Sequence, residues 1–275
     1  MTWNVLWRAG NWRERAPGIL RTLEAYRPDV LGLTETWAGD GTSQPELLAA
    51  ALGMHGVFVP TSLPPAPRSV EYPEQRSIDV GLGLLSRWPI ASTEVHDLPN
   101  DQRGGPAPSA LLATLDHPRG PLHVIVTCTE WEPLYAGDHL AQCTALAALA
   151  CDPRLDGQLP VLLIGDLNAD PSQPELRPLL EAMADTWTAG GGAPDAATID
   201  SALPFAPAEA TKQIGRRVDH VLARPGRLER PVSVRGVFLA GDRPIGGVYP
   251  SDHYAVGVDL DPSDPTDGHQ PLSRP

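Results

Sequence analysis

Apolar and polar residues alternate in short blocks along most of the chain. Short apolar or alternating runs bounded by turn-forming residues are typical of strands, whereas apolar positions three and four apart are typical of helices. Many strands and few helices indicate two packed sheets with helices on their outer faces. The pattern predicts helices at residues 12–26, 43–53 and 138–150, and strands at residues 2–7, 29–35, 80–86, 109–116, 121–128, 160–166, 216–223, 232–239 and 253–260.

Two residue signals mark the ends of these predicted helices. Asn11 and Glu14 have the spacing of a capping box, in which two side chains satisfy the first backbone N–H groups of a helix. Gly53 follows the second apolar-periodic segment, and glycine commonly ends a helix because it adopts a left-handed backbone. We therefore expect helices that start at residue 12 and stop before residue 53.

Two stretches interrupt this alternation. Residues 60–79 are rich in proline and have no periodicity, so they predict a long loop, and long loops in compact domains are often functional. Residues 262–275 are too polar to bury a core, so we expect a disordered C-terminal tail. No change of composition and no repeat divides residues 1–261, which we therefore expect to form one domain.

Composition restricts the location of the protein. No apolar run approaches the length of about 18 residues that a membrane-spanning helix requires. Cys128, Cys143 and Cys151 form no CxxC pair and are odd in number, so a disulfide framework is not expected. Residues 1–7 have the pattern of a strand and not that of a secretory signal. A cytoplasmic location follows from these features.

Charge argues against a general nucleic-acid-binding surface. The chain has 34 acidic and 21 basic residues and a net charge of -13. Such a chain repels polyphosphates at long range, and non-specific nucleic-acid binding usually requires a basic face. Arg68, Arg76, Arg87 and Arg103 are too scattered in the sequence to indicate a basic groove.

Candidate chemistry gathers where predicted strands end. Residues 164–171, IGDLNADP, place Asp166 and Asn168 two residues apart after a buried strand. The two side chains could share one face and point at a ligand, or the segment could simply be a turn, since Gly, Asp, Asn and Pro all form turns. Other polar residues at or near the ends of predicted strands are Asn4, Glu35, Asp219, Asp252 and His253.

The order of short segments indicates a family. WNV, LTE, GLLSRWPI, GDLN, RRVDHV and SDH follow one another between Thr2 and Leu260 in an order that resembles the endonuclease/exonuclease/phosphatase superfamily, the DNase I-like proteins. The resemblance implies a four-layer α/β sandwich, in which two packed mixed sheets are flanked by helices. It also implies an active site at one end of the strands.

The same resemblance implies a metal site. Glu35 matches the family's metal-ligand glutamate, Asn4 lies beside it, and Asp252 lies near the metal. Hard oxygen ligands suit Mg²⁺, which keeps several waters and takes only one or two carboxylates from a protein. We therefore expect Mg²⁺ as the cofactor, with Mn²⁺ or Ca²⁺ as alternatives.

The remaining matched residues have catalytic roles in the resemblance. Asp166 would orient or deprotonate the attacking water, and Asn168 would hold a phosphoryl oxygen. His253 would stabilise the phosphate, while Asp219 would accept its Nδ1 proton and so fix the ring.

The sequence departs from the family after the strand at residues 121–128. Many relatives have NTHL there, and Cys128 stands at the position of the histidine. Cys128 could be a small buried apolar residue, or its presence could mean that the leaving group needs no acid. His139 and Trp131 are further candidates for substrate binding, although a helix-start residue and a core indole are equally ordinary explanations. Cations that could replace the missing imidazole are His139, Arg8, Arg103 and Arg217.

These features predict a metal-dependent phosphoesterase. It would hydrolyse a phosphodiester or phosphomonoester of a small molecule or lipid headgroup by metal-assisted in-line attack of water. The alternatives are a DNA or RNA nuclease of the same fold and a catalytically silent binding module. The joint presence of all the matched acidic and imidazole groups argues against the silent module, and the sequence does not define the oligomeric state.

Overall fold

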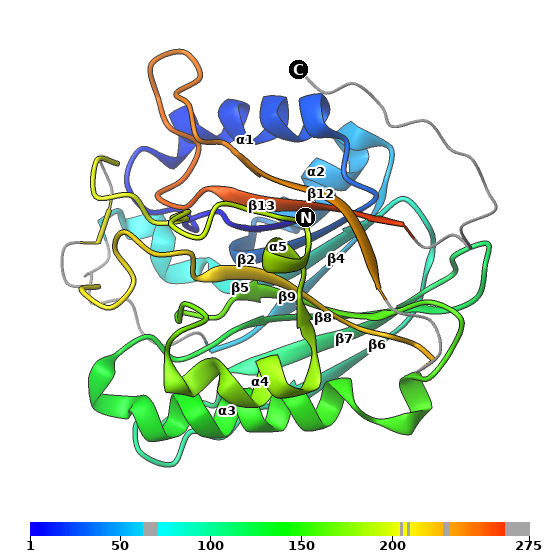
Figure 1. Cartoon of the computed structure of the whole chain (residues 1–275). Coiled ribbons are helices and arrows are strands. Elements are labelled where there is room, and N and C mark those ends of the chain that lie inside the picture. Colours follow the sequence, from blue (N-terminus) through cyan, green and yellow to red (C-terminus); the bar gives the residue numbers. More distant parts are fainter. Residues whose placement is uncertain (63–70, 204–205, 208–209, 228–231, 262–275) are drawn as a thin grey trace.

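The computed structural model describes residues 1–62, 71–203, 206–207, 210–227 and 232–261, and its elements form four layers (Figure 1). Two mixed sheets face each other in the middle, and helices cover both outer faces. The predicted four-layer α/β sandwich is therefore confirmed. Residues 63–70 of the predicted long loop and the predicted tail at 262–275 lie outside the described residues.

The first sheet contains the N-terminal and C-terminal strands side by side. β1 pairs in parallel with β2, and the other strand pairs described in this sheet are antiparallel. Within the described residues the order is β12 (Ser233–Ala240), β13 (Ala255–Asp261), β1 (Thr2–Asn4), β2 (Val30–Gly39), β5 (Asp79–Ser86) and β4 (His55–Pro60), with β3 (Thr42–Ser43) paired to β2.

The second sheet is built from the middle of the chain. β8 and β9 run parallel, and the other pairs are antiparallel. Its order, for the part of the chain that the structure describes, is β10 (Ala184–Asp185), β11 (Asp219–Arg224), β9 (Val161–Asp166), β8 (Leu122–Cys128), β7 (Ser109–Leu115) and β6 (Ile90–Asp97).

Helices shield the outer face of each sheet. α1 (Trp12–Tyr26) and α2 (Gln44–Leu52) cover the first sheet, and α3 (Ala136–Ala150) and α4 (Arg177–Ala182) cover the second (Figure 1). The short α5 (Thr186–Ala189) packs beside β11 and β12.

Alternation along β2 explains how one strand serves two apolar layers. Leu31 and Leu33 belong to the cluster beneath the helices, whereas Val30 belongs to the cluster between the sheets. Gly32 faces Ile164 of the second sheet so closely that a Cβ would overlap that side chain. The two sheets therefore pack closely where β2 and β9 meet, and both of these strands carry predicted site residues.

Most predicted elements exist, and the differences in their bounds have local causes. The strand predicted at residues 2–7 stops at Asn4 because Leu6 (φ 53°) and Trp7 (φ 34°) adopt left-handed backbone conformations. The last strand begins at Ala255, because the preceding residues form a loop. β6 was not predicted, since it is an edge strand whose residues are mostly exposed and polar.

The predicted capping box at α1 is wrong. Asn11 is the residue before the helix, but its side chain accepts no hydrogen bond from the backbone. Its Nδ2 instead donates to Oε2 of Glu14 at 2.9 Å. The predicted end of α2 is confirmed, because Gly53 has φ 66°.

Candidate active site and metal centre

Strand register places three predicted residues in a row at one end of the second sheet. Asp166 is the last residue of β9; it pairs with Asp219 at the start of β11 and with Cys128 at the end of β8. All three side chains are buried. Because adjacent strands lie about 5 Å apart, residues in register on neighbouring strands form a contiguous cluster.

An amide connects this row to the first sheet. Nδ2 of Asn4 donates to Oε1 of Glu35 at 3.0 Å and to Oδ2 of Asp166 at 2.9 Å. Asn4 ends β1, and Glu35 lies on the neighbouring β2. Carboxylates from both sheets therefore converge on one amide.

Glu35 has an unusual backbone. Its φ is 49°, and the register between β2 and β5 shifts between Leu33 and Thr36. The amide N–H of Trp7 donates to the carbonyl oxygen of Glu35 at 2.6 Å. A bulge of this kind redirects a side chain, and a non-glycine residue in a left-handed conformation costs about 1–3 kcal/mol. The site therefore retains a strained conformation that directs Glu35 toward Asn4.

His253 and Asp219 form a buried pair. Nδ1 of His253 donates to Oδ2 of Asp219 at 2.8 Å, and its Nε2 lies 3.9 Å from Oδ2 of Asp166. Burial alone would lower the pKa of His253, but the carboxylates of Asp219 and Asp166 outweigh burial and hold the pKa well above 6.5. The imidazole is therefore a cation at neutral pH, and its ring orientation is set by Asp219.

The carboxylates carry more negative charge than this imidazolium offsets. Burial, and then the charge of Asp219, raise the pKa of Asp166 from 3.8 to about 7. Burial, followed by the charge of Asp252, raises the pKa of Glu35. Such shifts mean that ionising these groups is unfavourable unless a further positive charge is present.

The donor set fits a divalent cation. Carboxylate oxygens of Asp166 and Asp219 lie within 4.8 Å of each other and of a nitrogen of His253. The carboxylates are the possible metal ligands of this group, because a protonated imidazole has no lone pair for a metal. Oδ1 of Asp219 is buried and has no hydrogen-bond partner among the described residues. Hard carboxylate oxygens with uncompensated negative charge are the ligands that Mg²⁺ and Mn²⁺ take in proteins.

Asn168 stabilises the end of β9. Its φ is 49°, and its backbone N–H donates to Oδ1 of Asp166 at 3.0 Å. Its side-chain Nδ2 donates to the carbonyl oxygen of Thr129 at 2.9 Å. Nδ2 also donates to Sγ of Cys128 at 3.8 Å, so both amide hydrogens have a partner. The segment IGDLNADP is therefore both a turn and the support of the Asp166 carboxylate.

Cys128 contributes a neutral thiol to the cluster. Its Sγ lies 3.8 Å from Nδ2 of Asn168 and is buried. Burial, and then the charges of Asp166 and Glu35, raise the pKa of the thiol well above 9.0. The thiol stays protonated and is a weak hydrogen-bond donor.

The other candidate substrate-binding residues lie beside the cluster. Nε2 of His139 lies 2.9 Å from the carbonyl oxygen of Leu167 and 3.2 Å from Oγ1 of Thr129, so the ring supports the loops after β8 and β9. The carbonyl oxygen of Trp131 accepts a hydrogen bond from Nε2 of Gln213 at 2.8 Å. The described contacts do not bring either side chain to Asp166.

Three arginines that could have replaced the missing imidazole instead bind aromatic rings or carboxylates outside the acidic cluster. The Arg8 guanidinium lies between two indoles, 4.5 Å from the ring of Trp12 and 3.8 Å from that of Trp37. The Arg103 guanidinium donates to Glu130, and the Arg217 guanidinium donates to Asp185 at 2.8 Å. Among the described residues, the imidazolium of His253 is the cation that hydrogen-bonds within the cluster.

Two residues that were not predicted, Arg15 and Ser251, support this site through hydrogen bonds to backbone carbonyl oxygens near Asn4. Arg15 is a buried arginine of α1, and Ser251 Oγ donates to the carbonyl oxygen of Asn4 at 2.7 Å. An arginine on the apolar side of an amphipathic helix is the signal that would have identified the first of them.

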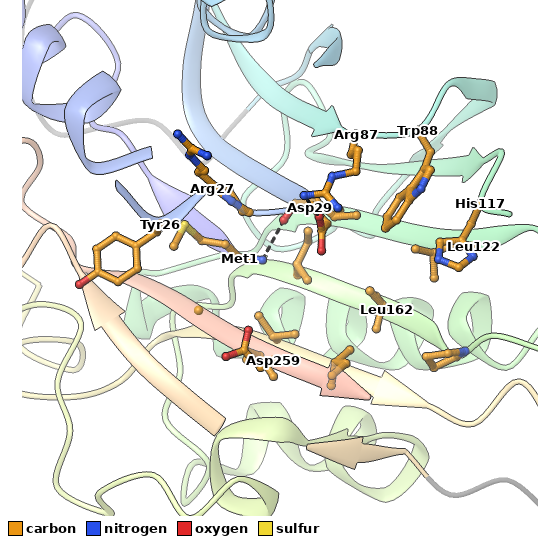
Figure 2. A pocket seen from close by; sticks show the side chains of 18 of the residues that line it. Met1, Tyr26, Arg27, Asp29, Arg87, Trp88, His117, Leu122, Leu162 and Asp259 are labelled. Carbon is orange, nitrogen blue, oxygen red and sulfur yellow. Dashed lines mark hydrogen bonds and ion pairs between the residues drawn. The ribbon is translucent and has the colours of Figure 1, made fainter. Parts of the chain in front are cut away.

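A cavity of about 480 Å³ opens at the opposite end of the sheets (Figure 2). Its walls include Met1 before β1, Val30 at the start of β2, Leu122 at the start of β8 and Leu260 near the end of β13. The predicted site residues lie toward the opposite ends of the strands, for example Asn4 at the end of β1 and Asp166 at the end of β9. None of the predicted site residues lines the cavity. The cavity is therefore separate from the acidic cluster.

Comparison with known proteins identifies the family. The model of the endonuclease/exonuclease/phosphatase family matches residues 1–253. No curated protein matches the chain. The chain belongs to the endonuclease/exonuclease/phosphatase family, whose members are phosphoester hydrolases that generally depend on a divalent metal.

Solved structures share the fold at low identity. An endonuclease/exonuclease/phosphatase from Beutenbergia cavernae is 23% identical, with a TM-score of 0.65 over 94% of this chain and 70% of that chain. The human Nocturnin catalytic domain with bound sulfate is 18% identical, with a TM-score of 0.68 over 94% and 92%. D. rerio TDP2 in complex with a single-strand DNA product is 18% identical, with a TM-score of 0.70 over 94% and 97%. These likenesses support the sandwich fold.

The described helices include none that combines the length and apolarity needed to cross a bilayer.

Proposed function

We propose that the protein hydrolyses a phosphodiester or phosphomonoester of a small molecule or lipid headgroup, with Mg²⁺ as its cofactor. The observation that supports this most is the convergence of Glu35, Asp166 and the Asp219–His253 pair on one end of the sandwich. Phosphoester hydrolysis requires a positioned water and positive charge beside the phosphoryl oxygens, and this cluster contains residue types suited to both.

The residues have distinct proposed roles. Glu35, Asn4 and Asp252 would hold the cation, directly or through its waters, and the bound cation would neutralise charge on the phosphoryl oxygens. Asp166 would orient the attacking water and accept its proton, since it is a buried carboxylate with a pKa of about 7.

The imidazolium and the amide would bind the phosphate itself. His253 would donate from Nε2 to a phosphoryl oxygen, because its Nδ1 is already bound to Asp219. Asn168 would hold another phosphoryl oxygen through Nδ2, in place of the long contact that Nδ2 makes with Sγ of Cys128 at 3.8 Å. Cys128 would contact the substrate as a neutral group. His139 and Trp131 would bind parts of the substrate that lie farther from the phosphate.

A nuclease is the second candidate. One specific observation favours it: a structural neighbour, D. rerio TDP2, was solved with a single-strand DNA product. The net charge of -13 favours a small substrate, because binding along a nucleic-acid backbone depends on basic side chains.

A cytoplasmic location is a further proposal. Cys128, Cys143 and Cys151 are all free thiols, and free thiols are typical of a reducing compartment.

A substrate screen tests the proposal. Chromogenic phosphomonoesters and phosphodiesters are incubated with Mg²⁺, Mn²⁺ or Ca²⁺, beside single- and double-stranded DNA and RNA. We expect metal-dependent turnover of a small phosphoester and no turnover in the presence of a chelator. Faster cleavage of nucleic acid than of every small ester would favour the nuclease, and tight ligand binding without turnover under any metal would favour the silent binding module.

Metal stabilisation should depend on pH. The pKa of Asp166 is raised above its unfolded value of 3.8, so without metal its ionisation lowers stability as pH rises from about 4 to 7. A divalent cation binds the ionised carboxylates, and we expect saturating MgCl₂ to raise Tm by about 5 °C at pH 8 and by much less at pH 5. Thermal unfolding with and without MgCl₂ measures both shifts; equal shifts at the two pH values would contradict this assignment.

Cys128→His is expected to preserve folding and to change kcat by less than Glu35→Gln does. The thiol is buried beside Asn168 and supplies no charge. Replacing it with an imidazole would therefore change contacts near the leaving group but would leave the proposed metal ligands in place, whereas Glu35→Gln removes one of them. Tm and kcat of the two variants are compared, with Cys128→Ala as the control for lost volume. A greater loss of kcat in Cys128→His than in Glu35→Gln would refute this ordering.

A further inference from the structure

Arg15 is a buried arginine of α1 whose guanidinium binds backbone oxygens from two distant segments. The side chain is 1% exposed. No carboxylate among the described residues accepts a hydrogen bond from it. Nη1 and Nη2 donate to five carbonyl oxygens at 2.8–3.1 Å, those of Val5, Leu6, Trp7, Ala9 and Pro250.

The first segment determines the orientation of Asn4 and the conformation at Glu35. Leu6 and Trp7 have left-handed backbones, and their carbonyl oxygens accept from Arg15. The N–H of Leu6 donates to Oδ1 of Asn4 at 3.0 Å, which directs Nδ2 toward the carboxylates. The N–H of Trp7 donates to the carbonyl oxygen of Glu35. Arg15 thus holds the Val5–Leu6 and Leu6–Trp7 peptide groups by their carbonyl oxygens, and the N–H groups of the same two peptides hold the two site residues.

The second segment leads directly to His253. Pro250 accepts from Arg15 and precedes Ser251, whose Oγ donates to the carbonyl oxygen of Asn4. The N–H of His253 donates to the same Oγ at 3.3 Å. Arg15 and Ser251 thus connect the strand that carries Asn4 to the segment that carries His253.

The guanidinium suits this position by shape and charge. Burial lowers the pKa of Arg15 to about 10, opposed by the charges of Asp252 and Glu35, so the side chain remains positive at neutral pH. A lysine ammonium has three donors at one point, whereas the planar fork of arginine reaches oxygens spread over two segments. Lysine would keep the charge and lose several of the five contacts.

We propose that Arg15 is a positioning residue of the candidate active site, acting through Asn4, Glu35 and His253 without contact to a reacting atom. Its catalytic consequence rests on the proposed function. Its structural consequence rests on the hydrogen bonds alone, so the two can be tested separately.

The experiment compares Arg15→Lys with Arg21→Lys, a change of the same type at an exposed arginine of the same helix. Amide hydrogen exchange, Mn²⁺ affinity and steady-state kinetics are measured on the full chain. In Arg15→Lys we expect the amides of Leu6, Trp7 and His253 to exchange at least about tenfold faster, while those of β8 keep wild-type rates. We expect the Kd for Mn²⁺ to rise about tenfold and kcat to fall about 10²-fold at nearly constant KM.

Each outcome decides the proposal. Wild-type exchange, Mn²⁺ affinity and kcat in Arg15→Lys would overturn it, and so would faster exchange throughout the protein with unchanged kcat per folded molecule. If Arg15→Lys does not fold, Ser251→Ala interrupts the same connection, and unchanged exchange at His253 in that variant would overturn the proposal. If the wild-type protein neither binds metal nor turns over a phosphoester, the proposed function fails, and the local exchange rates still decide whether Arg15 positions this site.

Discussion

Replacing Asp166 by asparagine is expected to lower kcat by about 10³-fold, because a positioned general base contributes about 10²–10⁴-fold. Asparagine has nearly the same shape but cannot accept a proton from water. It also brings a second NH₂ group toward Nδ2 of Asn4, which now donates to Oδ2 of Asp166 at 2.9 Å. Steady-state kinetics with the best substrate of the screen measure the loss.

Stability distinguishes this loss from misfolding. Because the pKa of Asp166 is raised by burial and by Asp219, its ionised form is unfavourable without metal. Asp166→Asn is therefore expected to keep or raise the metal-free Tm at pH 8. Asp116→Asn, at an exposed position, is the matched control and should have wild-type kcat. A kcat for Asp166→Asn within tenfold of wild type would remove the base from the proposed mechanism.

Glu35→Gln is expected to weaken metal binding and to lower kcat/KM by about 10³-fold, which corresponds to about 4 kcal/mol of transition-state stabilisation. The Glu35 carboxylate is held by a bulge and by Nδ2 of Asn4 at 3.0 Å. Glutamine retains the length and loses the charge, so high MgCl₂ should restore part of the activity. Kinetics over a range of MgCl₂ concentrations test this.

The control for this change is Glu24→Gln, since Glu24 is exposed on α1. It should have the metal dependence of the wild-type protein. If Glu35→Gln lowered kcat/KM by the same factor at every MgCl₂ concentration, Glu35 would act on the reaction by some route other than cation binding.

The sequence predicted the fold because its strongest signals are local. β8 and β9 are mostly apolar and buried, and such runs can be recognised without tertiary information. β4 lies at one edge of the first sheet and β6 at one edge of the second, and both strands are mostly exposed or half-buried, so they lack a buried apolar run. Pattern alone therefore did not predict β4 and β6, although it did predict another edge strand, β12, at residues 232–239.

The candidate site was predictable as a set of residues but not as a geometry. Motif order named Asp166, Asp219 and His253, and strand register then explains why they meet. The bulge that turns Glu35 depends on a contact with residue 7 and leaves no local pattern. The position of Arg15 on the apolar side of α1 marks it as unusual, but its role could not be predicted, because its partners are backbone carbonyls that no sequence pattern identifies.

Calorimetric titration of the metal-free protein with Mn²⁺ and Mg²⁺ measures whether the acidic cluster binds a divalent cation. We expect saturable uptake by the wild-type chain at about pH 8. Uptake should be much weaker in Glu35→Gln and Asp166→Asn, because the replaced carboxylates supply the charge that a cation would neutralise. Absence of uptake by the wild-type chain, or equal uptake in all three proteins, would contradict the proposed metal site.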